Sequence, residues 1–136
     1  YEGYLEALAS RGIAVDERYV LDTHWNENEA YSGMLQLLSL PEPPTALYCC
    51  NYNMTLGALR LLREEGLNVP DDLSLLSFDD VPLFQLHEAG ITAVAQPVDK
   101  IAETITSIMS SRLSGRGEHA RLLRHFNGRL SRVGIE

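Results

Sequence analysis

The chain has 136 residues, of which 45% are hydrophobic and 22% are charged, and its formal net charge is −8. This balance excludes an intrinsically disordered chain, and the negative charge argues against a surface that grips nucleic-acid phosphates by itself. No apolar run approaches the roughly 20 residues that a membrane-spanning helix needs. The opening residues do not form a signal peptide. Because the chain begins without Met and in a helical pattern, we expect it to be a fragment.

The first third of the chain predicts two helices with a short strand between them. Tyr1–Ser10 is helical by its apolar spacing, with Gly12 after its end. Tyr19–Leu21 is predicted to be the short strand. Asn26 followed by Glu29 resembles a capping box and opens the second helix. The apolar stripe expected on that helix, and the prolines that end it, are Ala30, Met34, Leu35 and Leu38, then Pro41, Pro43 and Pro44.

The middle third predicts two strands that flank a helix. Ala46–Cys50 is an apolar run of strand length, and Leu73–Phe78 is nearly all apolar, as expected for a strand covered on both faces. A helix is predicted from about Asn53 to Glu65, with Gly66 as its stop. Its expected stripe is Leu56, Leu59 and Leu62, and a turn follows at Val69-Pro70-Asp71-Asp72.

The last third predicts a strand over Thr92–Ala95, then a long helix from Pro97 to about Leu113. The apolar stripe of this helix is Ile101, Ile105, Ile108 and Met109; Gly115 and Gly117 break it, and closing strands follow at Leu122–Phe126 and Arg129–Val133. Strands that alternate with helices at this spacing indicate an α/β fold, with a mostly parallel sheet and helices on both faces.

Residues 112–136 carry six Arg against two Glu, so this stretch is basic although the whole chain is acidic. Nucleic-acid sites interleave aromatic side chains with their positive charges, and only Phe126 lies here. We interpret the stretch as a solvated or subdomain-facing surface.

No pattern in the chain indicates catalysis, a metal or a cofactor. Cys49 and Cys50 are adjacent, so a disulfide between them would be strained, and both are interpreted as reduced, buried residues of a cytoplasmic protein. No nucleotide-binding, nucleophile-elbow or zinc motif is present. The four histidines lack the spacing of metal ligands and are interpreted as surface or packing residues: His24, His87, His119 and His125.

Four side chains that follow predicted strands form the candidate ligand site. In an open parallel sheet, ligands bind beyond the carboxyl ends of the strands. Carboxylates and amides bond neighbouring hydroxyls, and an indole packs on the apolar face of a sugar, so the set suits a polyhydroxylated ligand. The four residues are Trp25, Asn51, Asp79 and Gln96.

Each of these residues also has a purely structural interpretation. A lone Trp is usually a core residue, so Trp25 could be buried. Asn51 could close a strand-to-helix turn. Asp79 and Asp80 could cap the segment Val81–Leu86, and Gln96 could be a surface residue before a proline.

The order and spacing of several motifs resemble the effector-binding region of the lactose-repressor/galactose-repressor family. They extend from Gly3-Tyr4-Leu5 to Arg129-Leu130-Ser131 and include the stretches 44–47, 51–59, 66–74, 77–80 and 91–97. The family implies two α/β subdomains of the periplasmic-binding-protein type with the effector between them. By this resemblance, residues 1–97 belong to the C-terminal subdomain. Residues 98–136 are the crossover helix and closing strands, which partly belong to the N-terminal subdomain.

The resemblance carries effector contacts to Trp25, Asn51, Asp79 and Gln96, the same four positions. This chain departs from the family at two places, and the altered turn at Tyr52 affects the identity of the ligand more than its class. The family usually has Asp where this chain has Tyr52, and Pro where it has Gly90.

The resemblance therefore implies a cytoplasmic, non-enzymatic regulator that binds a sugar, sugar phosphate or nucleoside. The effector shifts the population of subdomain arrangements in a homodimer and so changes operator binding. The DNA-reading helix-turn-helix would lie upstream, outside this chain. Two alternatives stay open: a periplasmic sugar-binding protein of a transporter, and an enzyme on a similar α/β scaffold.

Overall fold

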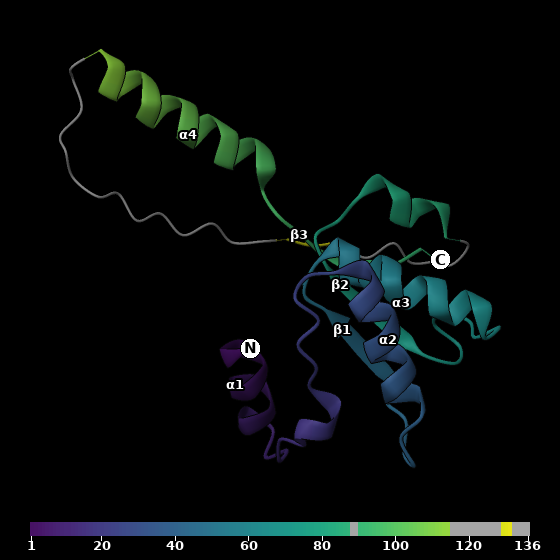
Figure 1. Ribbon diagram of the computed structural model, residues 1–136. Helices are drawn as coiled ribbons and strands as arrows, with labels where there is room; N and C mark the ends of the chain where they lie inside the picture. The colour runs from purple at the N-terminus through teal and green to yellow at the C-terminus, as the bar shows by residue number, and fades with distance from the viewer. Residues whose placement is uncertain (88–89, 115–128, 132–136) are drawn as a thin grey trace.

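The computed structural model describes residues 1–87, 90–114 and 129–131. Helices and strands alternate along these residues, so the predicted α/β fold class is confirmed (Figure 1). The elements are α1 (Glu2–Ser10), the short helix η1 (Glu17–Tyr19), α2 (Glu27–Leu38), β1 (Ala46–Cys49), α3 (Tyr52–Glu64), β2 (Ser74–Phe78), the short helix η2 (Pro82–Leu86), β3 (Thr92–Ala95), α4 (Val98–Leu113) and β4 (Arg129–Ser131).

The strands form one sheet in the order β1-β2-β3-β4. Strands β1, β2 and β3 run parallel, and β4 runs antiparallel to β3. In the register, Cys49 lies beside Ser77, and Ser77 lies beside Ala93. A parallel pair needs a crossover connection, and α3 is the crossover between β1 and β2. The carboxyl ends of the three parallel strands therefore meet at one edge of the sheet.

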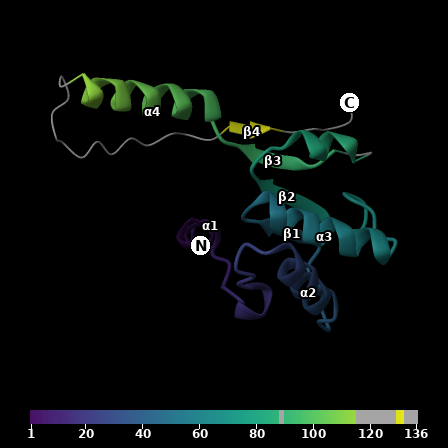
Figure 2. The same ribbon diagram turned by 45° about the horizontal axis from the view of Figure 1, so that its top comes forward.

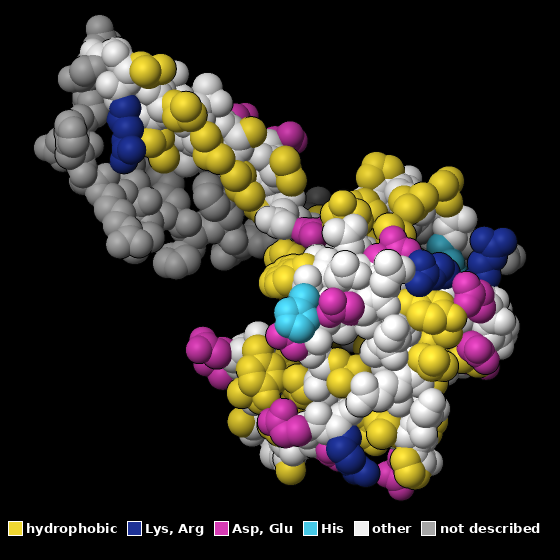
Figure 3. Space-filling model, viewed as in Figure 1, with side chains coloured by type: hydrophobic (Ala, Val, Ile, Leu, Met, Phe, Trp, Pro, Cys, Tyr) yellow, Lys and Arg dark blue, Asp and Glu magenta, His cyan; other side chains and the backbone are white. Residues whose placement is uncertain are grey.

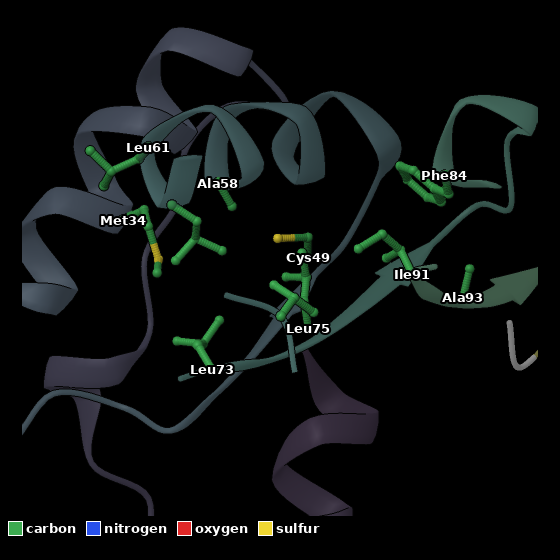
Figure 4. Packing of buried hydrophobic residues seen from close by; sticks show 11 residues of the cluster. Met34, Cys49, Ala58, Leu61, Leu73, Leu75, Phe84, Ile91 and Ala93 are labelled. Atoms are coloured by element: carbon green, nitrogen blue, oxygen red, sulfur yellow. The ribbon is translucent and has the colours of Figure 1, made fainter. Parts of the chain in front are cut away.

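The core lies between one face of the sheet and the helices α2 and α3 (Figure 4). In β2, Leu75 and Ser77 are buried on this face. The opposite face is less covered by the described residues, because Leu76 and Phe78 are only half-buried. The expectation that both faces of this strand are covered thus holds for one face only within the described part of the chain.

Helices α2 and α3 lie side by side and are joined by polar as well as apolar contacts (Figure 2). Arg60 on α3 donates to the Glu27 carboxylate on α2 at 2.9 Å. The same guanidinium lies 4.4 Å from the ring centroid of Tyr31, whose hydroxyl donates to Glu64. The backbones also approach closely at Gly57, where an added Cβ would lie 2.2 Å from the carbonyl oxygen of Glu27.

The predicted start of α2 is confirmed, and its predicted stripe is wrong in part. The Asn26 side chain accepts hydrogen bonds from the backbone N–H groups of Asn28 and Glu29. The buried residues are Ala30, Gly33, Met34 and Leu37. These positions follow the i, i+3, i+4, i+7 pattern of one helix face, whereas Leu35 points to solvent and is 46% exposed.

The predicted strand at Tyr19–Leu21 is not formed. Glu17–Tyr19 is the short helix η1, and Val20 has extended dihedral angles without belonging to a strand. A hollow between this segment and β1 is lined by Tyr19, Leu21 and Thr23 on one side and by Leu47 and Tyr48 on the other. The backbone is extended at Val20, but none of the described strands pairs with it.

Helix α4 extends away from the rest of the molecule and buries none of its residues (Figures 1 and 2). Its predicted stripe is only half-buried or exposed, with Ile105 at 51% and Met109 at 58% exposure, and it runs along the helix in Figure 3. No helix in the described residues is long and apolar enough to cross a membrane. The predicted break at Gly115 and Gly117, the predicted strand at Leu122–Phe126 and most of the basic stretch lie outside the described residues.

Candidate functional site

Three of the four candidate residues follow neighbouring parallel strands. Asn51 comes shortly after β1, Asp79 directly follows β2, and Gln96 directly follows β3. Since these strands are adjacent and parallel, the three residues share the carboxyl edge of the sheet. The structure therefore places them where open α/β sheets bind their ligands.

Asp79 and Gln96 are joined directly. The Gln96 side-chain amide donates to a carboxylate oxygen of Asp79, and the Asp79 backbone N–H donates to the carbonyl oxygen of Val94 at 3.1 Å. Asp79 is half-buried, and Gln96 is exposed. The alternative that Asp79 or Asp80 caps the following segment is wrong, because η2 begins without a side-chain cap. The pair keeps one carboxylate oxygen and the amide oxygen for a ligand.

Asn51 has the structural role that its alternative interpretation predicts. It is buried and is the N-cap of α3, where its side-chain oxygen accepts from the backbone N–H of Met54 at 2.8 Å. Its amide nitrogen donates to none of the described residues. A ligand role for Asn51 would therefore use the nitrogen and leave the cap intact.

Replacing Asn51 by Ala should lower the free energy of unfolding by about 1 kcal/mol, the usual cost of losing a side-chain N-cap. Asn51→Asp should retain most of the stability, because a carboxylate also accepts from the first turn and favours the positive end of the helix dipole. Urea unfolding followed by circular dichroism measures both variants. Equal stability of Asn51→Ala and the parent would show that the cap contributes nothing.

Trp25 is not a core residue, since 66% of it is exposed. It follows His24 in a turn where both residues have positive φ, 46° and 60°. The His24 backbone N–H donates to the Asp22 carboxylate at 3.0 Å, and the His24 ring contacts the Glu29 carboxylate at 2.8 Å. The hydrogen bond with Glu29 and the charges of Asp22 and Glu29 raise the pKa of His24.

Backbone strain in the described residues includes two of the four candidate residues, Trp25 and Asp79. The non-glycine residues with positive φ are His24, Trp25 and Asp79, at 74° for the last. Such conformations are disfavoured for residues with a Cβ and cluster at functional sites. His24 was predicted to be a surface or packing residue, and its exposed side chain agrees with a surface position. In the sequence it lies between two acidic residues that it contacts, Asp22 and Glu29.

The departure at Gly90 has a structural reason. Gly90 has φ 65°, and its N–H donates to the carbonyl oxygen of His87 at 2.8 Å. Proline has neither a positive φ nor an N–H. The loop before β3 therefore takes a path that a proline at this position would not allow.

The cysteines differ from each other, and the expectation that both are buried is wrong for one. Both thiols are free, with Cys49 buried and Cys50 exposed. Burial raises the pKa of Cys49 to about 12, against a smaller opposing effect of a hydrogen bond from Thr55. No group of three or more His, Cys, Asp or Glu among the described residues is arranged to hold a metal ion.

Cys50 should therefore react with iodoacetamide at pH 8 while Cys49 does not, because the thiolate is the nucleophile and a thiol with a pKa of about 12 is almost fully protonated at that pH. Mass spectrometry of the native protein should find one label, on Cys50. Cys50→Ser should remove it, and labelling of Cys49 at a similar rate would contradict the burial.

Comparison with known proteins identifies relatives over nearly the whole chain. Residues 1–130 match the family described as the periplasmic binding protein-like domain. The chain is 36% identical over 124 residues to the HTH-type transcriptional repressor CytR of Escherichia coli K12, which covers 90% of this chain and 36% of that repressor. The chain thus spans about a third of the length of such relatives.

The solved structures that this chain resembles are also transcriptional regulators. The Escherichia coli transcriptional repressor ascG is 30% identical and has a TM-score of 0.80, covering 96% of this chain and 46% of that one. A complex of the transcriptional regulator CelR with cellobiose is 29% identical, with a TM-score of 0.81, and covers 96% of this chain and 39% of that one.

Proposed function

Since this chain belongs to the periplasmic-binding-protein-like domain family and its relatives are LacI-family repressors, we propose that it forms part of the effector-binding domain of a transcriptional regulator. Residues 1–97 supply the C-terminal subdomain, and residues 98–136 supply the crossover helix and closing strands. The relatives are repressors and not transport proteins, so a periplasmic transport component is not favoured.

The observation that carries this proposal is the Asp79–Gln96 pair at the carboxyl edge of the sheet. Each residue has an oxygen left to accept from neighbouring hydroxyls of one ligand. Asn51 adds an amide donor, and the exposed Trp25 adds a flat apolar surface that suits the C–H face of a sugar ring. These features favour a sugar, a sugar phosphate or a nucleoside as the effector.

The effector acts by shifting a population. If it binds one arrangement of the subdomains more tightly than the other, that arrangement becomes more populated. The free energy of the equilibrium between the two arrangements shifts by the difference between their binding free energies. In a cytoplasmic homodimer, the change alters how two helix-turn-helix segments outside this chain meet the operator. No step requires catalysis, a metal or a cofactor.

The test is calorimetric titration of the full gene product with two sugars, ribose and cellobiose, with the sugar phosphate glucose 6-phosphate, and with the nucleoside cytidine. We expect saturable binding of at least one ligand, and a change in affinity for an operator selected from random duplex DNA when that ligand is present. Failure of all four to bind, or binding without any effect on DNA, contradicts the proposal. Chemical conversion of the bound ligand would favour an enzyme.

A further inference from the structure

Two buried hydroxyl groups lie directly beneath the strand-end residues of the candidate site. Thr55, in the first turn of α3, and Ser77, in β2, are each 0% exposed. Their side-chain oxygens are 2.7 Å apart, and either one can be the donor. This contact joins the turn after β1 to the end of β2 through side chains alone.

Each hydroxyl also contacts a carbonyl oxygen of its own turn. Thr55 Oγ1 is 2.9 Å from the carbonyl oxygen of Asn51, and Ser77 Oγ is 3.0 Å from that of Phe78, the residue before Asp79. The two hydroxyls therefore make three short contacts, although each has only one proton to donate.

Among the three oxygen–oxygen contacts, and apart from the Cys49 thiol that Thr55 also neighbours, counting protons leaves two favourable arrangements. In the first, Ser77 donates to Thr55 and Thr55 donates to the Asn51 carbonyl. In the second, Thr55 donates to Ser77 and Ser77 donates to the Phe78 carbonyl. If both protons pointed outward, two oxygens at 2.7 Å would face each other without a proton between them. The carbonyl that loses its hydroxyl donor in one arrangement gains it in the other.

We propose that Thr55 and Ser77 are positioning residues that form a hydroxyl relay, which couples the turn carrying Asn51 to the turn carrying Asp79. A movement that strengthens the hydroxyl bond at one carbonyl turns both protons and withdraws the donor from the other carbonyl. Burial makes this coupling effective, because hydrogen bonds in a low-dielectric interior are stronger and polarise their neighbours. Its consequence for effector binding rests on the proposed function, whereas the coupling itself does not.

Nuclear magnetic resonance of the full gene product, labelled with carbon-13 and nitrogen-15 and free of ligand, tests the relay. Ser77→Ala should fix the Thr55 proton on the Asn51 carbonyl, which moves the Asn51 carbonyl carbon resonance downfield. Thr55→Val, which keeps the side-chain shape, should fix the Ser77 proton on the Phe78 carbonyl and move the Phe78 carbonyl carbon downfield. In each variant, the resonance that shifts thus belongs to the other turn, and not to the turn whose hydroxyl is removed.

Two controls separate the relay from a purely structural role. Thr55→Ser keeps the hydroxyl and should restore the Phe78 resonance to its position in the parent. Thr104→Val removes a similar hydroxyl bond, from Thr104 to the Lys100 carbonyl in α4, and should leave the Asn51 and Phe78 carbonyl resonances unchanged. If Thr55→Val fails to fold, Ser77→Ala, the smaller change, decides the question through Asn51 alone.

Unchanged Asn51 and Phe78 carbonyl resonances in the respective variants would overturn the relay. So would equal shifts in Thr55→Val and Thr55→Ser, because those shifts would follow the altered side-chain shape and not the hydroxyl. The calorimetric panel then separates the two proposals. If the parent protein binds no ligand but Ser77→Ala and Thr55→Val show their downfield shifts, the proposed function is contradicted and the relay is supported.

Discussion

Gly57→Ala should destabilise the protein by about 2 kcal/mol or more, the range expected when a close-packed contact is overfilled. The new Cβ would lie 2.2 Å from the Glu27 carbonyl oxygen, 2.9 Å from the Tyr31 backbone nitrogen and 3.0 Å from the Ala30 Cβ. None of these atoms can rotate away, so α2 and α3 must move apart. Alanine gains about 1 kcal/mol over glycine in helix propensity, but a contact this short outweighs that gain.

Urea unfolding of the full gene product measures this effect against two matched substitutions. Gly3→Ala is the same change in a helix, at a position with nothing within 4 Å of the added Cβ, and should be neutral or stabilising. Gly33→Ala should be intermediate, because its Cβ would meet only side-chain atoms, Leu21 Cδ1 at 3.1 Å and Thr23 Cγ2 at 3.2 Å. If Gly57→Ala were as stable as Gly3→Ala, the two helices would not be in the close contact described.

The elements that the sequence predicts well are those with local boundary signals. The strand Thr92–Ala95 has the predicted bounds, and the long helix after Pro97 ends at Leu113 as predicted. The helix cap at Asn26 is also local, since its side chain bonds the backbone two and three residues later. Proline, glycine and capping residues act over a few positions, so one sequence is enough to find them.

The errors concern contacts between distant parts of the chain. Tyr19–Leu21 has no strand partner among the described residues, and no local pattern reveals whether a partner is present. Leu35 and Leu37 are both apolar residues of α2, and only the way α2 packs in the folded chain decides that Leu37 is buried and Leu35 is exposed. Secondary structure and burial of this kind depend on tertiary contacts that local propensity does not determine.

In the candidate site, too, some features can be predicted from the sequence, whereas others depend on contacts between distant residues. The rule on strand ends brings Asn51, Asp79 and Gln96 to one edge without any alignment, and the structure adds the bond between Asp79 and Gln96. The Thr55–Ser77 contact spans 22 residues, and its one local signal is a polar residue in the buried face of α3. The positive φ of Trp25 has no signal in the sequence, because tryptophan rarely adopts it.

Asp79→Asn should weaken effector binding about tenfold to a hundredfold, because a charged hydrogen bond to a neutral hydroxyl contributes roughly 1.5–3 kcal/mol. Asp79 offers Gln96 one oxygen and a ligand the other. Asparagine has a single side-chain oxygen, so the hydrogen bond from Gln96 or the one from the ligand must be lost. Its fold should be kept, since asparagine tolerates the positive φ of 74° at this position. The loss should therefore appear in calorimetric titration with the ligand that binds, and not in the unfolding midpoint.

Three further variants make the assignment specific. Asp80→Asn is the matched control, because Asp80 is exposed and makes no cap for η2, and it should bind nearly as well as the parent. Trp25→Ala should lose affinity, whereas Trp25→Phe should keep much of it, because an aromatic surface remains for the ligand. Normal binding by Asp79→Asn with loss of binding in Asp80→Asn would mean that the other carboxylate faces the ligand. If Asp79→Asn and Trp25→Ala both bound like the parent, the effector would contact other residues and the strand-end assignment would be wrong.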